Sequence, residues 1–387
     1  MLSARPYDVV LFGATGFTGG LTAEYLARHA SPQTRLALAG RSRERLEELR
    51  ARLPAREEIG LLHADLNDGA SMRALAGSTR VAISTVGPYI LYGEPLVAAC
   101  AAAGTDYVDL TGEPEFINRM WCRYQEQAAR TGARLVHSCG FDSIPYDLGV
   151  LYTVAQLPPG VPIHVDGFVR SAGTFSGGTY HSAIGAMGRL PQSSRVAAER
   201  RRVETGPAGR SVKGLARGPH RDVAAGGWVV PFPTVDPQTV LRSARALDRY
   251  GPRFTYAHYL VVKRLGVLVA MGAGVGAAVA LAQLPPTRNL LLKLKDPGEG
   301  PSLEQRAKGW FRVRFVAEGG GQRVLTEVSG GDPGYGETSK MLAESALCLA
   351  HDALPQRTGQ LTPAVAMGQA LIDRLLAAGI SFRVVGA

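Results

Sequence analysis

Six short apolar runs alternate with helical stretches over the first 145 residues of this 387-residue chain. Apolar strands separated by helices are typical of a parallel sheet that is covered on both faces. We therefore expect an α/β fold that begins with a Rossmann-type, doubly wound parallel sheet in a first domain of residues 1–148. The predicted strands are Asp8–Gly13, Arg35–Gly40, Gly60–Asp65, Val81–Val86, Tyr107–Leu110 and Arg134–Ser138, and the predicted helices include Phe17–Ala30, Arg43–Leu53, Glu94–Ala103 and Glu115–Thr131.

The pattern changes after about residue 150. Apolar and polar residues alternate in the last two predicted strands, which a glycine-rich turn joins into a hairpin. We expect residues 149–335 to form a second, α+β domain on an antiparallel sheet, with a basic loop over residues 191–220. The predicted strands are Ile163–Arg170, Gly227–Pro233, Phe254–Val262, Trp310–Ala317 and Arg323–Val328, and two helices, Glu337–Leu349 and Pro363–Ala378, close the chain.

The composition is that of a globular protein, with 45% hydrophobic and 20% charged residues, which excludes a wholly disordered or fibrous chain. Four widely spaced cysteines without a Cys-x-x-Cys pair predict neither a disulfide framework nor a metal site. No charged-then-apolar segment opens the sequence, so a cytoplasmic protein is expected. Residues 1–150 hold 15 Lys and Arg against 17 Asp and Glu, whereas the rest hold 28 against 16. This asymmetry predicts an anionic partner for the later region.

A glycine loop, Gly13-Ala14-Thr15-Gly16-Phe17-Thr18-Gly19, lies between the first predicted strand and helix. Its first two glycines allow a tight turn close to a pyrophosphate, and the third allows the helix to pack near the strand. The helix start supplies N–H donors to phosphate. A dinucleotide site is favoured by this strand–loop–helix context, and a purely structural turn is the alternative.

The end of the second predicted strand indicates which dinucleotide is bound. An acidic residue there would bind the ribose of NAD, but this chain has Arg41 and Ser42, which suit the 2′-phosphate of NADP. The alternative is that the arginines only solvate a helix start. Asp65 is expected to border the adenine, and Thr85, Val86, Gly87 and Pro88 are expected along the ribose and nicotinamide.

Several motifs resemble the saccharopine dehydrogenase-like oxidoreductases, and within them the actinobacterial trans-acting enoyl reductases. They are VLFGATGFTG at 10–19, LAGRS at 38–42, STVGPY at 84–89, AGTDYVDLTGE at 103–113, CGFDSIP at 139–145 and LTPAVAMG at 361–368. The resemblance implies an NADP-binding domain, a second α+β domain, and C-terminal helices at 336–387 that return to the first domain. It also implies reduction of enoyl intermediates that a polyketide synthase carries during cell-envelope glycolipid synthesis.

The candidate catalytic residues follow predicted strands, at the edge where open α/β sheets bind ligands. Tyr89 is a candidate donor to a thioester carbonyl, with a packing role as the alternative, and Asp142 is a candidate that equally suits a turn cap. Glu113 is expected to serve structure, substrate or neither. Ser176–Thr179 suits either a carbonyl oxygen or a plain N-cap. His181 is expected to be packed or solvated.

An uncharged segment of twenty residues, 265–284, has basic residues on both sides. Its length would span a bilayer, but the helices after Glu337 must rejoin the first domain, so a helix or hairpin on the membrane surface is favoured. A buried core helix or a homodimer interface is the alternative. The basic flanks suit an anionic membrane on the inner face of the plasma membrane, or an acidic acyl-carrier domain, and no nucleic acid is expected.

The sequence therefore predicts an NADPH-dependent reductase of a lipid-like, carrier-bound enoyl substrate. One alternative keeps the cofactor and reduces a ketone or an imine. Another is a membrane-associated cofactor-binding protein without catalysis.

Overall fold

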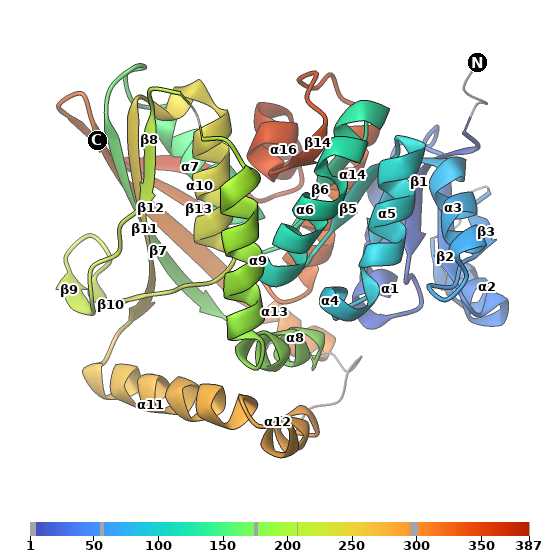
Figure 1. The fold of residues 1–387 in the computed structure, drawn as a ribbon, viewed down its shortest axis with the longest axis horizontal. Helices are drawn as coiled ribbons and strands as arrows, with labels where there is room; N and C mark the ends of the chain where they lie inside the picture. The colour runs from blue at the N-terminus through green and yellow to red at the C-terminus, as the bar shows by residue number, and fades with distance from the viewer. Residues whose placement is uncertain (1–4, 55–57, 174–176, 207, 295–300, 387) are drawn as a thin grey trace.

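Two β-sheets stand side by side in the computed structural model, which describes residues 5–54, 58–173, 177–206, 208–294 and 301–386 (Figure 1). Sheet A has seven strands in the order β14-β6-β5-β4-β1-β2-β3, and every pairing in it is parallel. Sheet B has eight strands, β15-β13-β12-β7-β11-β10-β9, with β8 beside β11. The predicted α/β class with a Rossmann-type first sheet is confirmed.

Sheet A carries the Rossmann strand order 3-2-1-4-5-6 with one additional strand, β14, from the C-terminal part of the chain. Prolines begin and left-handed glycines end two of its helices, α5 and α6, as the chemistry of helix ends favours. Its strands are β1 (Tyr7–Phe12), β2 (Leu36–Gly40), β3 (Gly60–His63), β4 (Thr79–Ser84), β5 (Asp106–Asp109), β6 (Arg134–Val136) and β14 (Gly359–Leu361). The helices of this part are α1 (Phe17–His29), α2 (Arg43–Arg52), α3 (Gly69–Ser78), α4 (Tyr89–Tyr92), α5 (Glu94–Ala103), α6 (Pro114–Thr131) and α14 (Gly336–His351).

Helix α14 lies far along the chain but packs on α1 and on strands β1, β4 and β5 of sheet A. It is buried along almost its whole length because the apolar residues Met341, Leu342 and Ala346 enter the main core. The same core continues through α7 (Ile144–Val154) into sheet B. The two sheets therefore share one hydrophobic core.

Sheet B is mixed, and the predicted antiparallel sheet is wrong in this detail. Strand β11 pairs in parallel with β7 and with β8, whereas the β12–β13 hairpin and the remaining pairs are antiparallel. Strand direction depends on how the connections run, which the alternation within a strand does not encode. The strands are β7 (Ile163–Ala172), β8 (Ser211–Gly214), β9 (His220–Asp222), β10 (Gly227–Pro231), β11 (Arg253–Val262), β12 (Trp310–Gly319), β13 (Gln322–Gly330) and β15 (Ser381–Gly386).

The predicted basic loop over residues 191–220 is also wrong, because helix α9 (Leu190–Val203) and strand β8 occupy much of it. Arg200 is buried, stacks over the Trp121 ring at 4.6 Å and donates to Glu204. A basic stretch was thus able to form a helix by packing one arginine against α6. The remaining helices are α8 (Gly177–Met187), α10 (Asp236–Ala246), η1 (Asp248–Tyr250), α11 (Leu265–Ala282), α12 (Pro285–Leu292), α13 (Leu303–Ala307), α15 (Pro363–Ala366) and α16 (Gly368–Ala377).

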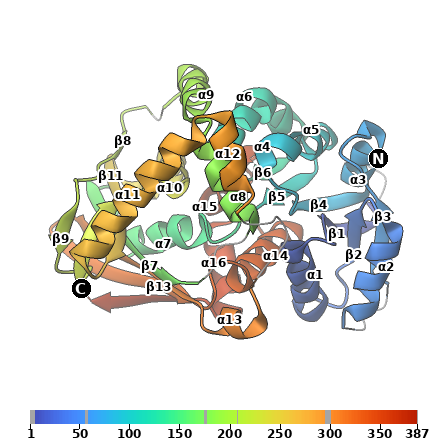
Figure 2. The same cartoon turned by 90° about the horizontal axis from the view of Figure 1, so that it is seen from below.

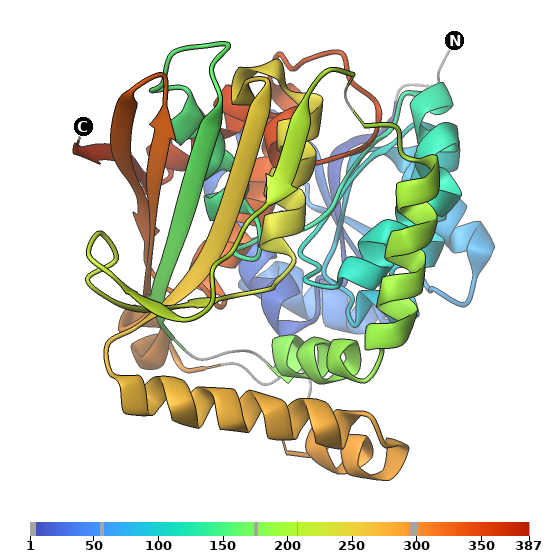
Figure 3. The ribbon, with the colours of Figure 1, turned by 60° about the vertical axis from the view of Figure 1, so that its left-hand side comes forward.

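Helix α11 lies along the outside of the molecule, below sheet B (Figures 1 and 3). It is long and apolar enough to cross a membrane, with a mean hydropathy of 2.2, yet only 6% of it is buried. The predicted alternative of a buried core helix is therefore wrong. The chain leaves sheet B at β11 and returns to the same sheet at β12, with β7 between them.

Candidate functional site

The turn between β1 and α1 is built on glycines that leave no space for a side chain. Gly13 has a φ of 84°, and a Cβ there would lie 2.6 Å from Cγ2 of Val86. A Cβ on Gly19 would lie 2.2 Å from the carbonyl oxygen of Gly13, so α1 approaches the strand end very closely. The N–H of Gly16 donates to that same carbonyl at 3.0 Å. The turn thus has the geometry that the sequence predicts.

The start of α1 is open to an anionic ligand. Its N-cap, Gly16, provides no side-chain cap, and the first turn holds no acidic residue. The N–H groups of Phe17 and Thr18 belong to the first turn, which has no intrahelical acceptors and carries the positive end of the helix dipole. The side chain of Ala14 is buried below the turn, whereas Thr15 is partly exposed. This arrangement suits a pyrophosphate at the helix N-terminus.

Replacing Gly19 by Ala should destabilise the chain and weaken NADPH binding together. The added methyl group meets backbone rather than a movable side chain, so we expect a loss of about 1–3 kcal/mol in the free energy of unfolding. Denaturant titration with and without NADPH measures both effects. Gly77→Ala is the matched control, because a Cβ at Gly77 meets nothing within 4 Å. Equal behaviour of the two variants would contradict the tight packing of the turn.

Arg41 stands at the end of β2 and is exposed. It makes no ion pair and no side-chain hydrogen bond with the residues that the structure describes. Its neighbour Arg43 is already paired with Glu47 at 2.9 Å. Ser42 caps α2 by accepting from the N–H of Arg45 at 3.3 Å, which leaves its own hydroxyl proton to donate. Arg41 and Ser42 are therefore the available donors beside a ribose 2′-phosphate.

The remaining predicted cofactor residues lie at the carboxyl ends of β3 and β4. The Asp65 carboxylate accepts from the N–H of Asn67 at 2.9 Å, so it also fixes a turn. Thr85 donates its hydroxyl to the carbonyls of Phe12 and Gly13 at 3.2 and 3.1 Å, which joins β4 to the glycine turn. Val86 and Pro88 are partly buried, whereas Gly87 is exposed and joined to Pro88 by a cis peptide bond. Their roles toward the cofactor stay predictions.

Tyr89 is buried at the start of α4 and already has partners. Its hydroxyl donates to the carbonyl of Ser84 at 2.9 Å, and its ring packs against Phe116. Burial raises the pKa of Tyr89 well above its usual range. Both backbone N–H groups at Tyr89 and Ile90 donate to the Glu113 carboxylate at 2.9 Å. The geometry favours the predicted packing alternative over the donor role for Tyr89, and Glu113 fixes this turn.

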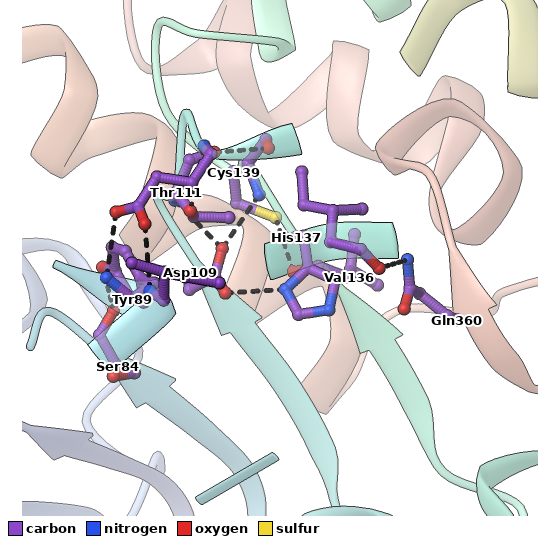
Figure 4. A network of polar contacts seen from close by, with 12 residues as sticks. Ser84, Tyr89, Asp109, Thr111, Val136, His137, Cys139 and Gln360 are labelled. Carbon is purple, nitrogen blue, oxygen red and sulfur yellow. Dashed lines mark hydrogen bonds and ion pairs between the residues drawn. The ribbon is translucent and has the colours of Figure 1, made fainter. Parts of the chain in front are cut away.

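A buried Asp109–His137 pair, which no local motif marks in the sequence, lies next to Tyr89 (Figure 4). Nδ1 of His137 lies 2.7 Å from Oδ2 of Asp109. Oδ1 of Asp109 accepts from the N–H groups of Ser138 and Thr111 at 3.0 and 3.1 Å. Asp109 thereby joins the ends of β5 and β6, where Ser138 adopts a φ of 61°. The pair therefore holds the carboxyl ends of β5 and β6 together from inside the protein.

Asp142 follows β6 at the same edge, and its carboxyl group lies over Gly112. A Cβ on Gly112 would come within 3.0 Å of Oδ2 of Asp142, so the glycine provides the space for this group. Burial raises the pKa of Asp142 to about 6. Asp142 has no hydrogen-bond or ion-pair partner among the residues that the structure describes. The group is therefore protonated, and able to give a proton to a substrate, as the pH falls below about 6.

Two residues from the second part of the chain, Asp236 and His258, join Asp142 at this edge. Asp236 begins α10, and burial together with the charge of Asp142 raises its pKa well above the usual range. His258 lies on β11, and burial lowers its pKa to about 3, which keeps the ring neutral. Nε2 of His258 lies 3.7 Å from Oδ2 of Asp236. No local motif marks either residue in the sequence, because the fold alone brings them to Asp142.

Helix α8 runs past this edge and joins it to the apolar helices. Ser182 donates to Oε1 of Glu113 at 2.9 Å, and Tyr180 donates to the carbonyl of Leu291 in α12 at 2.9 Å. Gln283 at the end of α11 donates to the carbonyl of Met187 at 2.8 Å. Figure 2 shows α8 beside α12 and α11. Of the predicted N-cap segment, Ser176 lies outside the described residues.

Comparison with known proteins finds an NADP-binding family model and relatives that are named as trans-acting enoyl reductases. The model of the saccharopine dehydrogenase NADP-binding domain matches residues 9–136. A Mycobacterium tuberculosis protein named as a trans-acting enoyl reductase is 41% identical, with 98% of this chain and 97% of the relative covered. The trans-acting enoyl reductase of Mycobacterium bovis is 38% identical, with 97% of each chain covered. The predicted NADP cofactor is thereby confirmed.

A solved structure has a similar fold over the whole chain. The saccharopine dehydrogenase (L-Glu forming) of Saccharomyces cerevisiae superposes with a TM-score of 0.56, at 12% identity, and covers 98% of this chain and 100% of its own. At this identity the likeness concerns the fold alone.

Proposed function

The chain belongs to the saccharopine dehydrogenase-like oxidoreductases, in the group of trans-acting enoyl reductases, and we propose that it reduces the carbon–carbon double bond of a carrier-bound, lipid-like enoyl thioester. The observation that carries this proposal is the pairing of a complete NADP turn with an acid at the same sheet edge, Asp142, that has no partner among the described residues. NADPH supplies a hydride when it is bound. The protein must then supply a proton.

Each group at the edge has a role that its surroundings suit. The α1 N-terminus holds the pyrophosphate, and Arg41 with Ser42 holds the 2′-phosphate. Residues 85–88 border the nicotinamide side and orient it toward Asp142. Asp142 protonates the α-carbon after hydride reaches the β-carbon, which leaves an Asp142 carboxylate and a saturated thioester. Tyr89 keeps the loop in place through its bond to Ser84.

The test measures NADPH oxidation with a panel of enoyl thioesters of increasing acyl length. The absorbance of the reduced nicotinamide reports the rate. Ketones and imines form the second half of the panel. We expect turnover with the thioesters, rising with chain length, and none with the small carbonyl compounds. Turnover with a ketone or an imine alone would replace the proposed function by the alternative reduction, and binding of NADPH without any turnover would favour a non-catalytic protein.

We also propose that α11 rests on the anionic cytoplasmic surface of the plasma membrane. Its exposed residues include Val269 and Val275, which expose 65% and 54% of their surface. Exposed basic residues flank the apolar segment, with Lys263 before α11 and Lys293 after α12. Since both ends of the segment return to sheet B, a helix that lies on the surface suits this chain better than one that crosses the bilayer. The contacts of α8 with α12 and with the end of α11 support a position of this surface close to the candidate site.

A double substitution, Val269→Glu with Val275→Glu, should abolish binding to vesicles that contain anionic lipid. Two buried charges oppose the insertion of an apolar helix into the interface. Flotation of the two proteins with anionic and with neutral vesicles measures the effect, and turnover of a short, soluble thioester should stay unchanged. Val223→Glu is the matched control, because Val223 is 97% exposed elsewhere on the surface.

If the double variant still floats, α11 does not contact the membrane. If instead it changes from dimer to monomer in size-exclusion chromatography, the face is an interface between two copies. An acidic carrier domain of a polyketide synthase remains the proposed bearer of the substrate in either case, because the excess of basic residues lies in this part of the chain.

A further inference from the structure

A guanidinium group from the second part of the chain lies over the first turn of α1. Arg306 belongs to α13, and its Cζ lies 5.9 Å from the centroid of the Phe17 ring. Phe17 is the first residue of α1, next to the Gly16 N-cap. A cation within about 6 Å of a ring centroid is attracted to the ring. Arg306 thus lies at the helix start that suits a pyrophosphate, although it is outside residues 9–136 of the NADP-binding family model.

Contacts at both ends of α13 fix its position. A capping box forms its first turn. After its last turn, Gly309 lies against Asp332, because a Cβ on Gly309 would come within 2.8 Å of Cβ of Asp332. Asp332 accepts from the N–H of Tyr335 at 3.1 Å, and the Tyr335 ring lies edge-on to the Phe17 ring with centroids 4.7 Å apart. Arg306 and Phe17 are therefore joined both directly and through Asp332 and Tyr335.

The donors of Arg306 are not used within the described part of the chain. Its side chain forms no ion pair and no hydrogen bond with the described residues, and its Nε is buried without a partner. Lys340, near the start of α14, is by contrast paired with Glu337 at 2.8 Å. A buried donor without an acceptor is costly, and native proteins usually satisfy such a donor with water, an ion or a ligand. The position of Arg306 over α1 makes an anion at that helix start the fitting acceptor.

We propose that Arg306 binds the pyrophosphate of NADPH, so that a residue of the second part of the chain completes the cofactor site. This inference rests on the cofactor site of the proposed function and is independent of the reaction. The planar fork of a guanidinium matches two phosphate oxygens, and the N–H groups at the start of α1 bind the same anion from the backbone. NADPH and NADH share the pyrophosphate, whereas only NADPH has the 2′-phosphate. Arg306 therefore raises the affinity for both nucleotides, and Arg41 distinguishes between them.

The first measurement compares the nucleotide affinities of Arg306→Ala and the wild-type protein by fluorescence titration. We expect the Kd to rise about tenfold or more for NADPH and NADH alike, which is the scale of a lost hydrogen bond to a charged group. Lys308→Ala is the matched control, because it removes an exposed positive charge two residues away and should leave both affinities within about twofold. An unchanged affinity in Arg306→Ala, an equal loss in the two variants, or a loss for NADPH alone would overturn the proposal.

Phosphorus NMR of the NADPH complexes supplies a readout that is specific to each phosphate. In Arg306→Ala the pyrophosphate resonances of bound NADPH should shift from their wild-type positions, and the 2′-phosphate resonance should stay. Arg41→Ala should give the reverse pattern. If Arg306→Ala does not fold, Arg306→Lys takes its place, since it keeps the charge, loses the planar fork and should shift the same resonances.

Pyrophosphate resonances at their wild-type positions in the Arg306 variant would refute the role of Arg306. If the wild-type protein binds NADPH but reduces no enoyl thioester, the proposed reduction fails. The titrations and spectra still decide whether Arg306 binds the pyrophosphate, because neither depends on turnover.

Discussion

Asp142→Asn should lower kcat for enoyl reduction by a factor on the order of 10²–10⁴, the usual contribution of a general acid. The amide has the size of the carboxyl group but cannot give a proton to the α-carbon. NADPH affinity should stay unchanged, because the cofactor residues lie on other turns. Steady-state rates and a fluorescence titration with NADPH measure the two quantities.

Tyr89→Phe is the comparison that separates the two candidate donors. The hydroxyl of Tyr89 donates to the carbonyl of Ser84 inside the protein. Loss of this hydrogen bond should lower the free energy of unfolding by about 1 kcal/mol and leave kcat within about threefold of the wild-type value. The reverse outcome, a large loss of kcat in Tyr89→Phe and a small one in Asp142→Asn, would show that Tyr89 is the donor.

The pH dependence of the wild-type enzyme follows from the same acid. Burial raises the pKa of Asp142 to about 6, and a donor must be protonated to act. The value of kcat/KM should therefore fall as the pH rises through about 6, and this limb should be absent from the residual activity of Asp142→Asn. A limb that persists in the variant would belong to another group.

Arg41→Ala should weaken NADPH binding by about 1.5–3 kcal/mol, the scale of hydrogen bonds to charged groups, which is roughly a tenfold to 150-fold rise in Kd. Arg41 is exposed at the end of β2 and has no partner in the described part of the chain, so its guanidinium is available to the 2′-phosphate. NADH binding should stay the same, because NADH lacks that phosphate. Fluorescence titration with both nucleotides gives the two affinities.

Arg43→Ala is the matched control for Arg41, because Arg43 is already paired with Glu47 on the surface of α2. We expect little change in either affinity. An equal loss in both arginine variants would indicate a general effect of positive charge, and an unchanged NADPH affinity in Arg41→Ala would assign the 2′-phosphate to other residues.

The cofactor turn was predictable because its determinants are local. Gly13, Gly16 and Gly19 lie within one strand–turn–helix unit, and Gly13 and Gly19 are required by contacts with Val86 and with the backbone of the same turn. Strands β1, β2, β4 and β5 were predictable for the same reason, since each is a short and mostly buried run. Strand β14 was not predicted.

The two neighbours of Asp142 were not predictable, because Asp236 and His258 carry no sequence pattern of their own. Asp236 looks like an ordinary first-turn residue of a helix, and His258 like one residue of an alternating strand. They approach the segment after β6 through contacts between distant parts of the chain, Ser143 with Thr239 in α10 and the ring of Tyr146 with His258. The direction of β11 beside β7 was missed for a similar reason.

The most direct test of enoyl reduction uses NADPH deuterated at C4 with a carrier-bound enoyl thioester and follows the mass of the acyl product. We expect the wild-type protein to form a saturated thioester with one deuterium at the β-carbon and a solvent proton at the α-carbon, and Asp142→Asn to lose this product. An unchanged enoyl chain in the presence of bound NADPH, or deuterium found in an alcohol instead, would contradict it.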